Sequence, residues 1–401
     1  MREPRGMNQR LRTICVRAGW DPKDSKHGDI IPPIHMATTY AMQNSEEARR
    51  IIKGEQSGYV YGRFGNPTVS VLERCFAELE GFEAAIAFAS GNAAHRTLID
   101  HFCSPGDNVV LHGDTYGGTG HLFGYRSKLT SSVEARFVED PTDLSSWRAC
   151  IDEKTQFVFV ESPTNPHGNV YDIPGIALVT HEFEKPLVVD STIATPLIMR
   201  PREHGARIVS HSLSKDGAGF SQTMAGILLG SLEFVDHIYK NEHRDAGALL
   251  APFNAWLIHV FGISTLYERM QSHASNTKAL LSALQGHSRI KRIWHPFSET
   301  NPTCDMALSL LDDYTPLIYL ELDATAEQTK RIIDAHVLAL QAVHLGTSET
   351  LVTLCEETTH GVLTPEERVL AGIVPNGIRI SVGRENPYEI VDDVLQALKS
   401  I

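Results

Sequence analysis

Short apolar runs alternate with helical stretches through the middle of the chain. Each run has four to six residues and lacks the strict polar alternation of a half-exposed strand. Continuous hydrophobicity over this length predicts strands covered on both faces, as in a mainly parallel sheet flanked by helices. The predicted fold class is therefore α/β. The predicted strands cover residues 84–89, 108–112, 157–161, 187–190, 207–210 and 226–230.

The first clear helix begins at Asn66-Pro67, where a capping residue precedes a proline in the first turn. An apolar stripe at helical spacing follows, and Gly81 ends it. The residues before this helix have weak periodicity and include Pro32-Pro33. This part of the chain is predicted to be an extended N-terminal arm.

Beyond Pro252 the pattern becomes helical and continues to Leu284. A smaller α+β part follows, with strands predicted at 317–322 and 378–382 and a closing helix at 388–398. We therefore expect an N-terminal arm (residues 1–64), a main α/β domain (65–254) and a C-terminal α+β domain (255–401).

The composition argues against several classes of partner. The chain has 401 residues and a net charge of −13, from 36 basic and 49 acidic side chains. This acidic balance disfavours nucleic acid and anionic membranes as partners. The most apolar stretch, 246–263, contains Pro252, Asn254 and His259, so a buried helix is expected there rather than a membrane span.

Cysteines and short motifs narrow the prediction further. The six cysteines are scattered without CxxC spacing, which is typical of reduced thiols in a cytoplasmic protein. The basic residues near the N-terminus lack the apolar core of a signal peptide. HExxH, P-loop and dinucleotide-binding glycine motifs are absent, so no metal, nucleotide or nicotinamide site is expected.

Lys215 lies beyond a predicted strand, between hydroxyls and glycines, in the run His211-Ser-Leu-Ser-Lys-Asp-Gly-Ala-Gly219. A lysine there is well placed to form a Schiff base with a cofactor aldehyde. Pyridoxal phosphate (PLP) needs such a lysine, a carboxylate for its ring nitrogen and small polar groups for its phosphate. Asp190 ends another predicted strand and can supply the carboxylate, its alternative role being to cap a turn. PLP is the predicted cofactor, held by the α/β domain; a surface lysine is the alternative.

Other polar residues follow the ends of predicted strands, where open α/β sheets bind their ligands. Ser90, Gly91 and Asn92 open a helix, so their N–H groups can hold a phosphate, although an ordinary turn would have the same sequence. Ser212 and Ser214 flank the lysine and can add hydroxyl donors to that phosphate.

Two further side chains suggest roles in substrate chemistry. Tyr116 lies in a glycine-rich turn, where its ring can stack on a planar cofactor and its phenol can act as acid or base. Arg379 is a charge inside an apolar strand, which is costly unless it meets a carboxylate. It can grip the α-carboxylate of an amino acid or form an internal salt bridge.

With these motifs in place, the chain resembles the cysteine/methionine-metabolism family of fold-type I PLP enzymes. That family includes cystathionine γ-synthases and γ-lyases, methionine γ-lyases and O-acetylhomoserine sulfhydrylases. The likeness runs nearly end to end, with motifs at residues 59–68, 90–91, 116–119, 161–166, 189–192, 211–215 and 379–383.

The resemblance implies roles for residues of the main domain. Lys215 would carry the cofactor and move protons, and Asp190 would pair with the ring nitrogen. Tyr116 would stack on the ring, and Asn165 would contact the phenolic oxygen or the substrate carboxylate. The remaining cofactor-binding residues would be Gly91, Asn92, Thr192, Ser212 and Ser214.

The resemblance also implies self-association. Tyr61 and Arg63 would reach the cofactor phosphate of a neighbouring subunit, because the family builds its sites across a dimer interface. Two such dimers usually form a tetramer.

Several positions depart from the family pattern. His344 stands where a serine is common near the substrate carboxylate, so it has either a substrate-binding or a structural role. Gly118 and Arg244 replace a cysteine and an aspartate of methionine γ-lyases, and Val343 replaces a glutamate of cystathionine γ-lyases. Phe220 and Gln222 replace a histidine and an aspartate beyond the lysine, at the end of its loop.

The resemblance implies an enzyme of the transsulfuration type, a transferase or a lyase in amino-acid metabolism. It would carry out γ-replacement or γ-elimination on a homoserine-derived or sulfur-containing amino acid, through a vinylglycine-type intermediate. The alternatives are a methionine-type γ-lyase or a cystine-type β-lyase and, from another class, a PLP-fold protein that binds without turnover.

Overall fold

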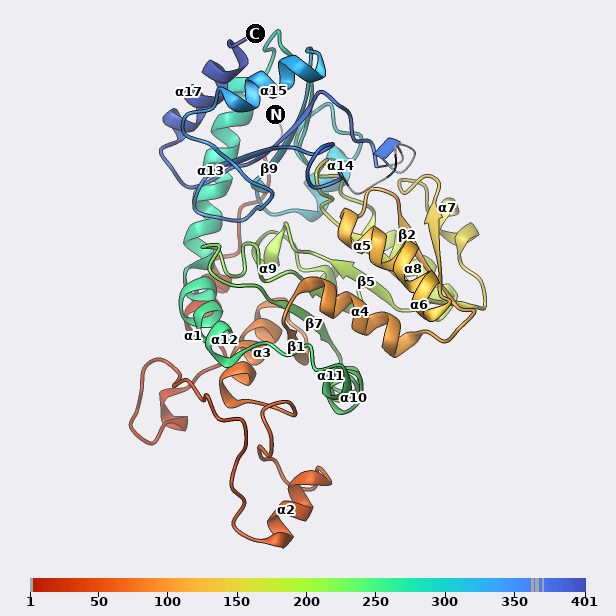
Figure 1. Cartoon of the computed structure of the whole chain (residues 1–401), viewed down its shortest axis with the longest axis vertical. Coiled ribbons are helices and arrows are strands. Elements are labelled where there is room, and N and C mark those ends of the chain that lie inside the picture. Colours follow the sequence, from red (N-terminus) through yellow and green to blue (C-terminus); the bar gives the residue numbers. More distant parts are fainter. Residues whose placement is uncertain (1–2, 362–363, 365–367, 370) are drawn as a thin grey trace.

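The computed structural model describes residues 3–361, 364, 368–369 and 371–401, and these residues form two β-sheets (Figure 1). The larger sheet has seven strands in the order β1-β7-β6-β5-β4-β2-β3. Strands β2 to β6 run parallel to one another, and β7 runs antiparallel to both β6 and β1. The fold class is α/β, as predicted. The strands are β1 (Ala84–Phe88), β2 (Asn108–His112), β3 (Glu134–Val138), β4 (Thr155–Glu161), β5 (Leu187–Asp190), β6 (Ile208–His211) and β7 (Gly226–Gly230).

The predicted strands match the larger sheet within two residues at each end, except that β3 was not predicted. Strand β3 pairs only with β2 and lies at the edge of the sheet. Four of its five residues are exposed or half-buried, so it lacks the continuous apolar pattern of a covered strand.

Apolar side chains fill both faces of this sheet. One core joins the sheet to α3 and α8, and a second joins its other face to α4 and α10. Helix α3 begins and ends as predicted: the Asn66 side chain accepts from the Thr68 N–H, and Gly81 follows the helix with φ 75°. The helices around this sheet are α3 (Pro67–Glu80), α4 (Gly91–Phe102), α5 (Gly117–His121), η2 (Leu122–Arg126), α6 (Ser127–Ser131), α7 (Leu144–Cys150), α8 (Ile173–Glu182), α9 (Thr195–Ile198), η3 (Pro201–His204), α10 (Leu232–Lys240) and α11 (Glu242–Ala246).

The smaller sheet has five strands in the order β10-β11-β12-β9-β8 and lies with α13, α15 and α17 in the upper part of Figure 1. The predicted strands β9 and β12 and the helix α17 are present, whereas β8, β10 and β11 were not predicted. The elements are β8 (Ile290–Trp294), α14 (Cys304–Leu310), β9 (Leu317–Leu322), α15 (Ala326–Asp334), β10 (Leu340–Gln341), β11 (Leu351–Leu354), β12 (Gly377–Ser381) and α17 (Pro387–Leu398).

The helical stretch between the sheets is interrupted. It consists of α12 (Pro252–Leu257), the π-helical η4 (Ile258–Gly262), the 3₁₀ turn η5 (Ile263–Thr265) and α13 (Leu266–Leu284). The Arg269 side chain donates hydrogen bonds to the carbonyl of Gly262 at 2.7 Å and to that of Asp216 at 2.8 Å. A Cβ at Gly262 would lie 2.2 Å from the Gly217 carbonyl oxygen, so this glycine lets the irregular segment approach the Lys215 loop.

The N-terminal part has little regular structure. Helix α1 (Gln9–Arg17) packs on α3 and α13, and it is followed by η1 (Pro22–Asp24) and α2 (Ser45–Ile52). The segment around α2 extends away from both sheets at the bottom of Figure 1. The domain boundaries at residues 64 and 254 stay a prediction. Across the described residues, every helix is too short or too polar to cross a membrane.

Candidate active site

A cavity of about 610 Å³ lies at the carboxyl ends of the central parallel strands. Residues of the smaller sheet complete its wall, with Arg379 on β12 and His344 on the loop after β10. All the predicted site residues except Tyr61 and Arg63 line it: Gly91, Asn92, Tyr116, Asn165, Asp190, Thr192, Ser212, Ser214, Lys215, His344 and Arg379.

One end of the cavity is formed by the first turn of α4 and the Lys215 loop. The Ser90 hydroxyl caps α4 by accepting from the Ala93 N–H at 3.2 Å. A Cβ at Gly91 would lie 3.1 Å from the Ser212 Cβ, so a glycine suits this close approach. The Ser212 N–H donates to the Thr192 hydroxyl at 2.8 Å. This end combines a helix N-terminus with hydroxyls, which suits a phosphate.

The two serines beside the lysine differ. The Ser214 hydroxyl donates to the Ala225 carbonyl at 3.2 Å and accepts from the Ala225 N–H at 3.0 Å. These bonds tie the Lys215 loop to the segment before β7, so the Ser214 hydroxyl is already engaged with backbone.

Asp190 is buried at the end of β5. Its Oδ2 lies 3.2 Å from Nε2 of His95, and its Oδ1 accepts the Thr192 N–H at 2.9 Å and hydroxyl at 2.5 Å. Burial disfavours the carboxylate, but the bonds and charge of His95 and the bonds from Thr192 outweigh it, so the pKa of Asp190 is lowered. Asp190 is therefore an anion facing the cavity, and it does more than cap a turn.

Glu161 is a second buried carboxyl on the cavity wall, at the end of β4. Burial and the charge of Asp190 raise the pKa of Glu161 well above its ordinary value. Its oxygens accept the N–H groups of Tyr116 at 2.6 Å and Asn165 at 3.0 Å. Glu161 thus fixes the loops that carry two predicted site residues.

His95 and Glu161 were not predicted as site residues. His95 lies on α4, where its Nδ1 is 3.1 Å from the Thr119 hydroxyl. A histidine within a helix and a glutamate closing a strand have many ordinary uses, so neither gives a signal alone. Glu161 does close a predicted strand and begin the family-like motif at residues 161–166, and these are the cues that the sequence offers.

Lys215 and His344 meet across the cavity. The lysine Nζ lies 3.0 Å from Nδ1 of His344. Burial and the charge of Arg379 lower the pKa of Lys215 to about 8. Burial and the charge of Lys215 lower the pKa of His344 to about 4. At neutral pH the imidazole is therefore neutral and can accept a hydrogen bond from the lysine.

Arg379 is fully buried on β12, yet its cationic group lacks an acidic partner among the described residues. It donates to the Asn165 side-chain oxygen at 3.2 Å and to the His344 carbonyl at 2.9 Å, and its Nε has no partner. The internal salt bridge considered from the sequence is therefore absent from the described part of the chain. A buried guanidinium of this kind is suited to an incoming carboxylate.

Tyr116 immediately precedes α5 and is 41% exposed beside the cavity. A Cβ at Gly118 would lie 2.5 Å from Cε1 of the Tyr116 ring. The ring therefore occupies space that any larger residue at position 118 would need. Gly118 permits this placement of the tyrosine.

Tyr61 and Arg63 lie outside the cavity lining. The Arg63 guanidinium donates to the Arg244 carbonyl at 2.5 Å and lies over the rings of Tyr61 and Phe64, 5.8 and 5.0 Å from their centroids. Within one subunit, these two residues are not brought to the site.

The departures from the family pattern have distinct environments. Val343 lines the cavity and is 61% exposed, whereas Arg244 forms an ion pair with Asp245 at 2.8 Å. The Phe220 ring faces Arg269, whose guanidinium carbon is 5.3 Å from the ring centroid. Gln222 donates to the Ala218 carbonyl at 3.2 Å. Phe220 and Gln222 thus support the far side of the Lys215 loop.

A half-buried lysine, an ionised buried carboxylate and a helix N-terminus around one cavity are typical of the class of PLP-dependent enzymes. The chain matches the family model described as Cys/Met metabolism PLP-dependent enzyme over residues 12–399. It belongs to that family, and its cofactor is PLP.

Individual relatives cover nearly the whole chain. An L-methionine gamma-lyase of Pseudomonas putida is 35% identical over 97% of both chains. An O-succinylhomoserine sulfhydrylase of Pseudomonas aeruginosa is 32% identical over 97% of this chain and 95% of the relative. A crystal structure of a putative O-acetylhomoserine (thiol)-lyase from Campylobacter jejuni superposes with a TM-score of 0.92 and 30% identity, covering 97% of this chain and 99% of that one. That structure contains N'-pyridoxyl-lysine-5'-monophosphate at its position 205.

Lys215 provides a direct test of the site's electrostatics. Arg379→Met removes a positive charge that lowers the lysine's pKa, so the pKa of Lys215 should rise. Less of the amine is then neutral at pH 7, and cofactor-free protein should capture PLP several-fold more slowly. The rate of return of the cofactor's visible absorbance, measured from pH 6 to 10, gives the midpoint. Arg126→Met, at an exposed position outside the cavity, is the control. An unchanged midpoint in Arg379→Met would contradict the assignment.

Proposed function

We propose that the protein catalyses PLP-dependent γ-replacement or γ-elimination on a homoserine-derived or sulfur-containing amino acid. The observation that carries the proposal is the buried Arg379, which lacks an acidic partner among the described residues and shares a cavity with Lys215 and Asp190. The family match and the similarity to lyases and sulfhydrylases support the same reaction class.

The substrate's α-carboxylate would bind Arg379. Its guanidinium is held by Asn165 and by the His344 carbonyl, and its Nε remains without a partner. An incoming carboxylate would supply the missing negative charge inside the cavity. Arg379 and Asn165 would thereby set which way the amino acid faces.

The cofactor would be held by residues of the large sheet. Asp190 would pair with its ring nitrogen, with His95 and Thr192 keeping the carboxylate charged. Gly91 and Asn92 at the start of α4, with Ser212, would hold its phosphate. When bound, PLP supplies an electron-withdrawing ring that stabilises negative charge on the substrate. The engaged hydroxyl of Ser214 assigns that residue mainly to shaping the loop.

Lys215 would move protons on the substrate. Its lowered pKa favours a neutral amine, whose Nζ can accept the substrate's α-proton. His344 holds Nζ from the opposite wall at 3.0 Å. Tyr116, with its ring at the cavity rim, would donate a proton to the departing γ-substituent.

Gly118 favours replacement over elimination in this proposal. The Tyr116-Gly117-Gly118-Thr119 run resembles that of synthases and sulfhydrylases, and Tyr116 occupies the space beside Gly118. The second candidate is a methionine-type γ-lyase, favoured by the 35% identity to such an enzyme. A cystine-type β-lyase and a non-catalytic binding protein are the remaining alternatives.

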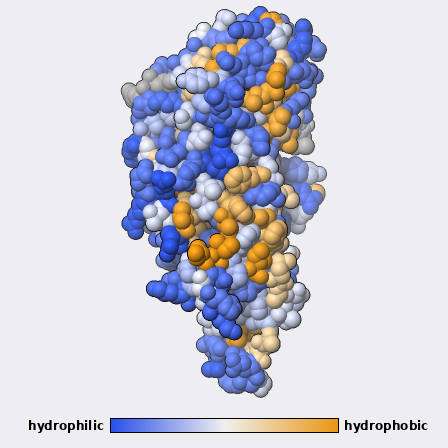
Figure 2. Space-filling view, turned by 90° about the vertical axis from the view of Figure 1, so that its left-hand side faces the viewer, coloured by the Kyte–Doolittle hydropathy of each residue, from blue (hydrophilic) through white to orange (hydrophobic). Residues whose placement is uncertain are grey.

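We also propose that two copies form a dimer with shared sites, and that two dimers form a tetramer. Figure 2 shows apolar side chains gathered over the middle of the face formed by α1 and α12 in Figure 1. Exposed large apolar residues of α1, α12, the adjoining η4 and the arm include Val16, Ile30, Ile31, Phe253 and Phe261. An apolar patch of this kind is typical of a subunit interface. The six cysteines are scattered along the chain without CxxC spacing, which supports a cytoplasmic location.

The reaction can be tested with O-acetylhomoserine, O-succinylhomoserine, methionine, cystathionine, canavanine and homocysteine, each with and without a thiol. We expect a new thioether amino acid when a thiol is present, or a 2-oxo acid and ammonia when it is not. Lys215→Ala should lose product by about 10²–10⁴-fold, because Lys215 is the group proposed to move the α-proton. Products are identified by mass. Bound PLP without product from any substrate would support the non-catalytic alternative.

His344→Ser should change the ranking of substrates more than the affinity for PLP. The histidine fills space on the substrate side of Lys215, and serine is smaller and cannot reach Nζ in the same way. The kcat/KM values across the panel and the PLP dissociation constant are compared. His121→Ser, an exposed histidine outside the cavity, is the control. A fixed ranking with weakened PLP binding would mean that His344 is structural.

Mixing Arg63→Ala with Lys215→Ala protein should restore roughly a quarter of wild-type activity, since half of random dimers are hybrids with one intact site. This follows if Arg63 serves the partner's cofactor. A mixture of Asp190→Ala and Lys215→Ala is the control, because both residues belong to the same subunit's cavity and its hybrids should have no intact site. Proven subunit exchange without restored activity would refute shared sites.

A further inference from the structure

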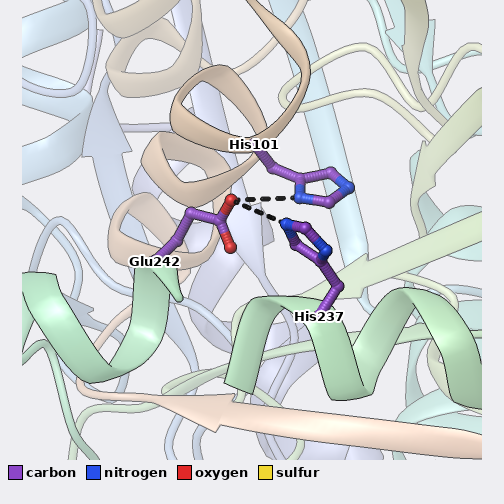
Figure 3. Close-up of side chains that lie close together, drawn as sticks. All are labelled: His101, His237 and Glu242. Carbon is purple, nitrogen blue, oxygen red and sulfur yellow. Dashed lines mark hydrogen bonds and ion pairs between the residues drawn. The ribbon is translucent and has the colours of Figure 1, made fainter. Parts of the chain in front are cut away.

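Three side chains of metal-binding type meet at the C-terminal end of α4 (Figure 3). His101 comes from the last turn of α4, His237 from α10 and Glu242 from the first position of α11. None of the three lines the cofactor cavity. They form a cluster that the proposed reaction does not use.

The donor atoms are close enough to share one ion. His101 Nδ1 lies 3.2 Å and His237 Nε2 lies 3.7 Å from the same oxygen of Glu242, and all three ligand atoms lie within 4.8 Å of one another. Tetrahedral zinc with bonds of ~2.0–2.2 Å separates neighbouring ligand atoms by roughly 3.3–3.5 Å. A movement of a few tenths of an ångström to about one ångström would complete this geometry.

The break between α10 and α11 produces this meeting. Asn241 joins the helices with φ −121° and ψ −91°, and its side chain donates to the His237 carbonyl at 2.8 Å. The chain therefore turns after Lys240, and Glu242 faces back toward His237, as Figure 3 shows. A continuous helix would separate these positions by more than one turn.

Among the described residues, Glu242 has no lysine or arginine as an ion-pair partner. The Glu242 Oε2 atom is buried and has no hydrogen-bond partner. The basic residues nearest in sequence on α10 and α11 pair elsewhere, Lys240 with Asp236 and Arg244 with Asp245. The carbonyl end of α4 adds partial negative charge, which favours a cation.

A cavity of about 590 Å³ adjoins the cluster and is lined by His101, His237 and Phe234. His237 is also partly open to solvent, with 56% of its side chain exposed. An ion could therefore enter, and a water molecule could serve as a further ligand.

We propose that His101, His237 and Glu242 bind a divalent transition-metal ion, best matched by Zn²⁺, with water at the fourth position. Two imidazoles and one carboxylate form a donor set that zinc accepts readily. The ion would join the end of α4 to the turn between α10 and α11. The start of the same helix, roughly 15 Å away at 1.5 Å per residue, forms the predicted phosphate site. The metal is thus a structural clamp behind the cofactor site and takes no part in the chemistry.

Zinc binding is measured on metal-stripped holoenzyme that retains PLP, by titration with Zn²⁺ against a chromogenic chelator and by metal content after dialysis. We expect about one ion per chain. His237→Ala and Glu242→Gln should each weaken binding at least tenfold. Titration with Co²⁺ should give the visible bands of a tetrahedral ion at wavelengths beyond those of PLP. Zn²⁺ should also raise the Tm of wild-type protein and not of either variant.

His181→Ala is the matched control, since His181 is an exposed histidine in the last turn of α8. It should bind Zn²⁺ like wild type. Circular dichroism and the PLP absorbance show that each variant is folded. Substitution of His237 is less liable to disturb folding than that of Glu242, because the His237 side chain is 56% exposed. Equal Zn²⁺ affinity and stoichiometry in wild type, His237→Ala and Glu242→Gln would overturn the proposal, as would the absence of Zn²⁺ binding to wild type.

Discussion

The burial of Arg379 is the constraint on which the site depends. Taking a guanidinium out of water is costly unless a carboxylate accompanies it, and among the described residues it has only two neutral oxygens as partners. Arg379 lies on strand β12 in the middle of the smaller sheet, where β9 pairs with this strand on one side and β11 on the other. The smaller sheet thereby holds a permanent positive charge against the carboxyl ends of the larger one. The same charge lowers the pKa of Lys215, so carboxylate recognition and lysine reactivity have one electrostatic origin.

Two carboxyls on adjacent strands show how the larger sheet divides its roles. Asp190 and Glu161 are register partners at the ends of β5 and β4, and both are buried. Two negative charges so close together repel each other, and the surroundings of the two carboxyls shift their pKa values in opposite directions. His95 and Thr192 stabilise the charged form of Asp190, whereas Glu161, with raised pKa, is favoured in its protonated form. The anion is thus placed for a cationic ring nitrogen, while Glu161 organises the loops that carry Tyr116 and Asn165.

Local sequence patterns predicted much of the fold, because strands covered on both faces are continuously apolar. They also predicted most of the cavity wall, because the polar ends of parallel strands lie at one edge of the sheet. Lys215, Asp190 and Arg379 each contrast with their apolar neighbours in sequence, so they were visible. His95 and Glu161 act through partners that are remote in the chain, and the spacing of residues in the sequence does not predict such contacts. Strand β3 was not predicted, because an edge strand keeps exposed residues. The helix predicted after Pro252 is interrupted, because the Arg269 side chain donates a hydrogen bond to the backbone carbonyl of Gly262. Tyr61 and Arg63 were recognised only through resemblance, and one subunit alone does not bring them to the cavity.

Helix α4 connects the two sites, and its polarity suits both. Its N-terminal end is the positive end of the helix dipole and has a Ser90 cap beside Ser212, which favours an anion such as a phosphate. Its C-terminal end has carbonyl groups and His101 beside Glu242, whose Oε2 atom is buried, and this favours a cation. The sequence predicted no metal because His101 is remote from His237 and Glu242 along the chain, and the turn at Asn241 brings the latter two together. A cation at one end and an anion at the other both favour the same orientation of the helix dipole. Because the same helix carries His95, the partner of Asp190, its position matters to the cofactor at its middle as well as at its start.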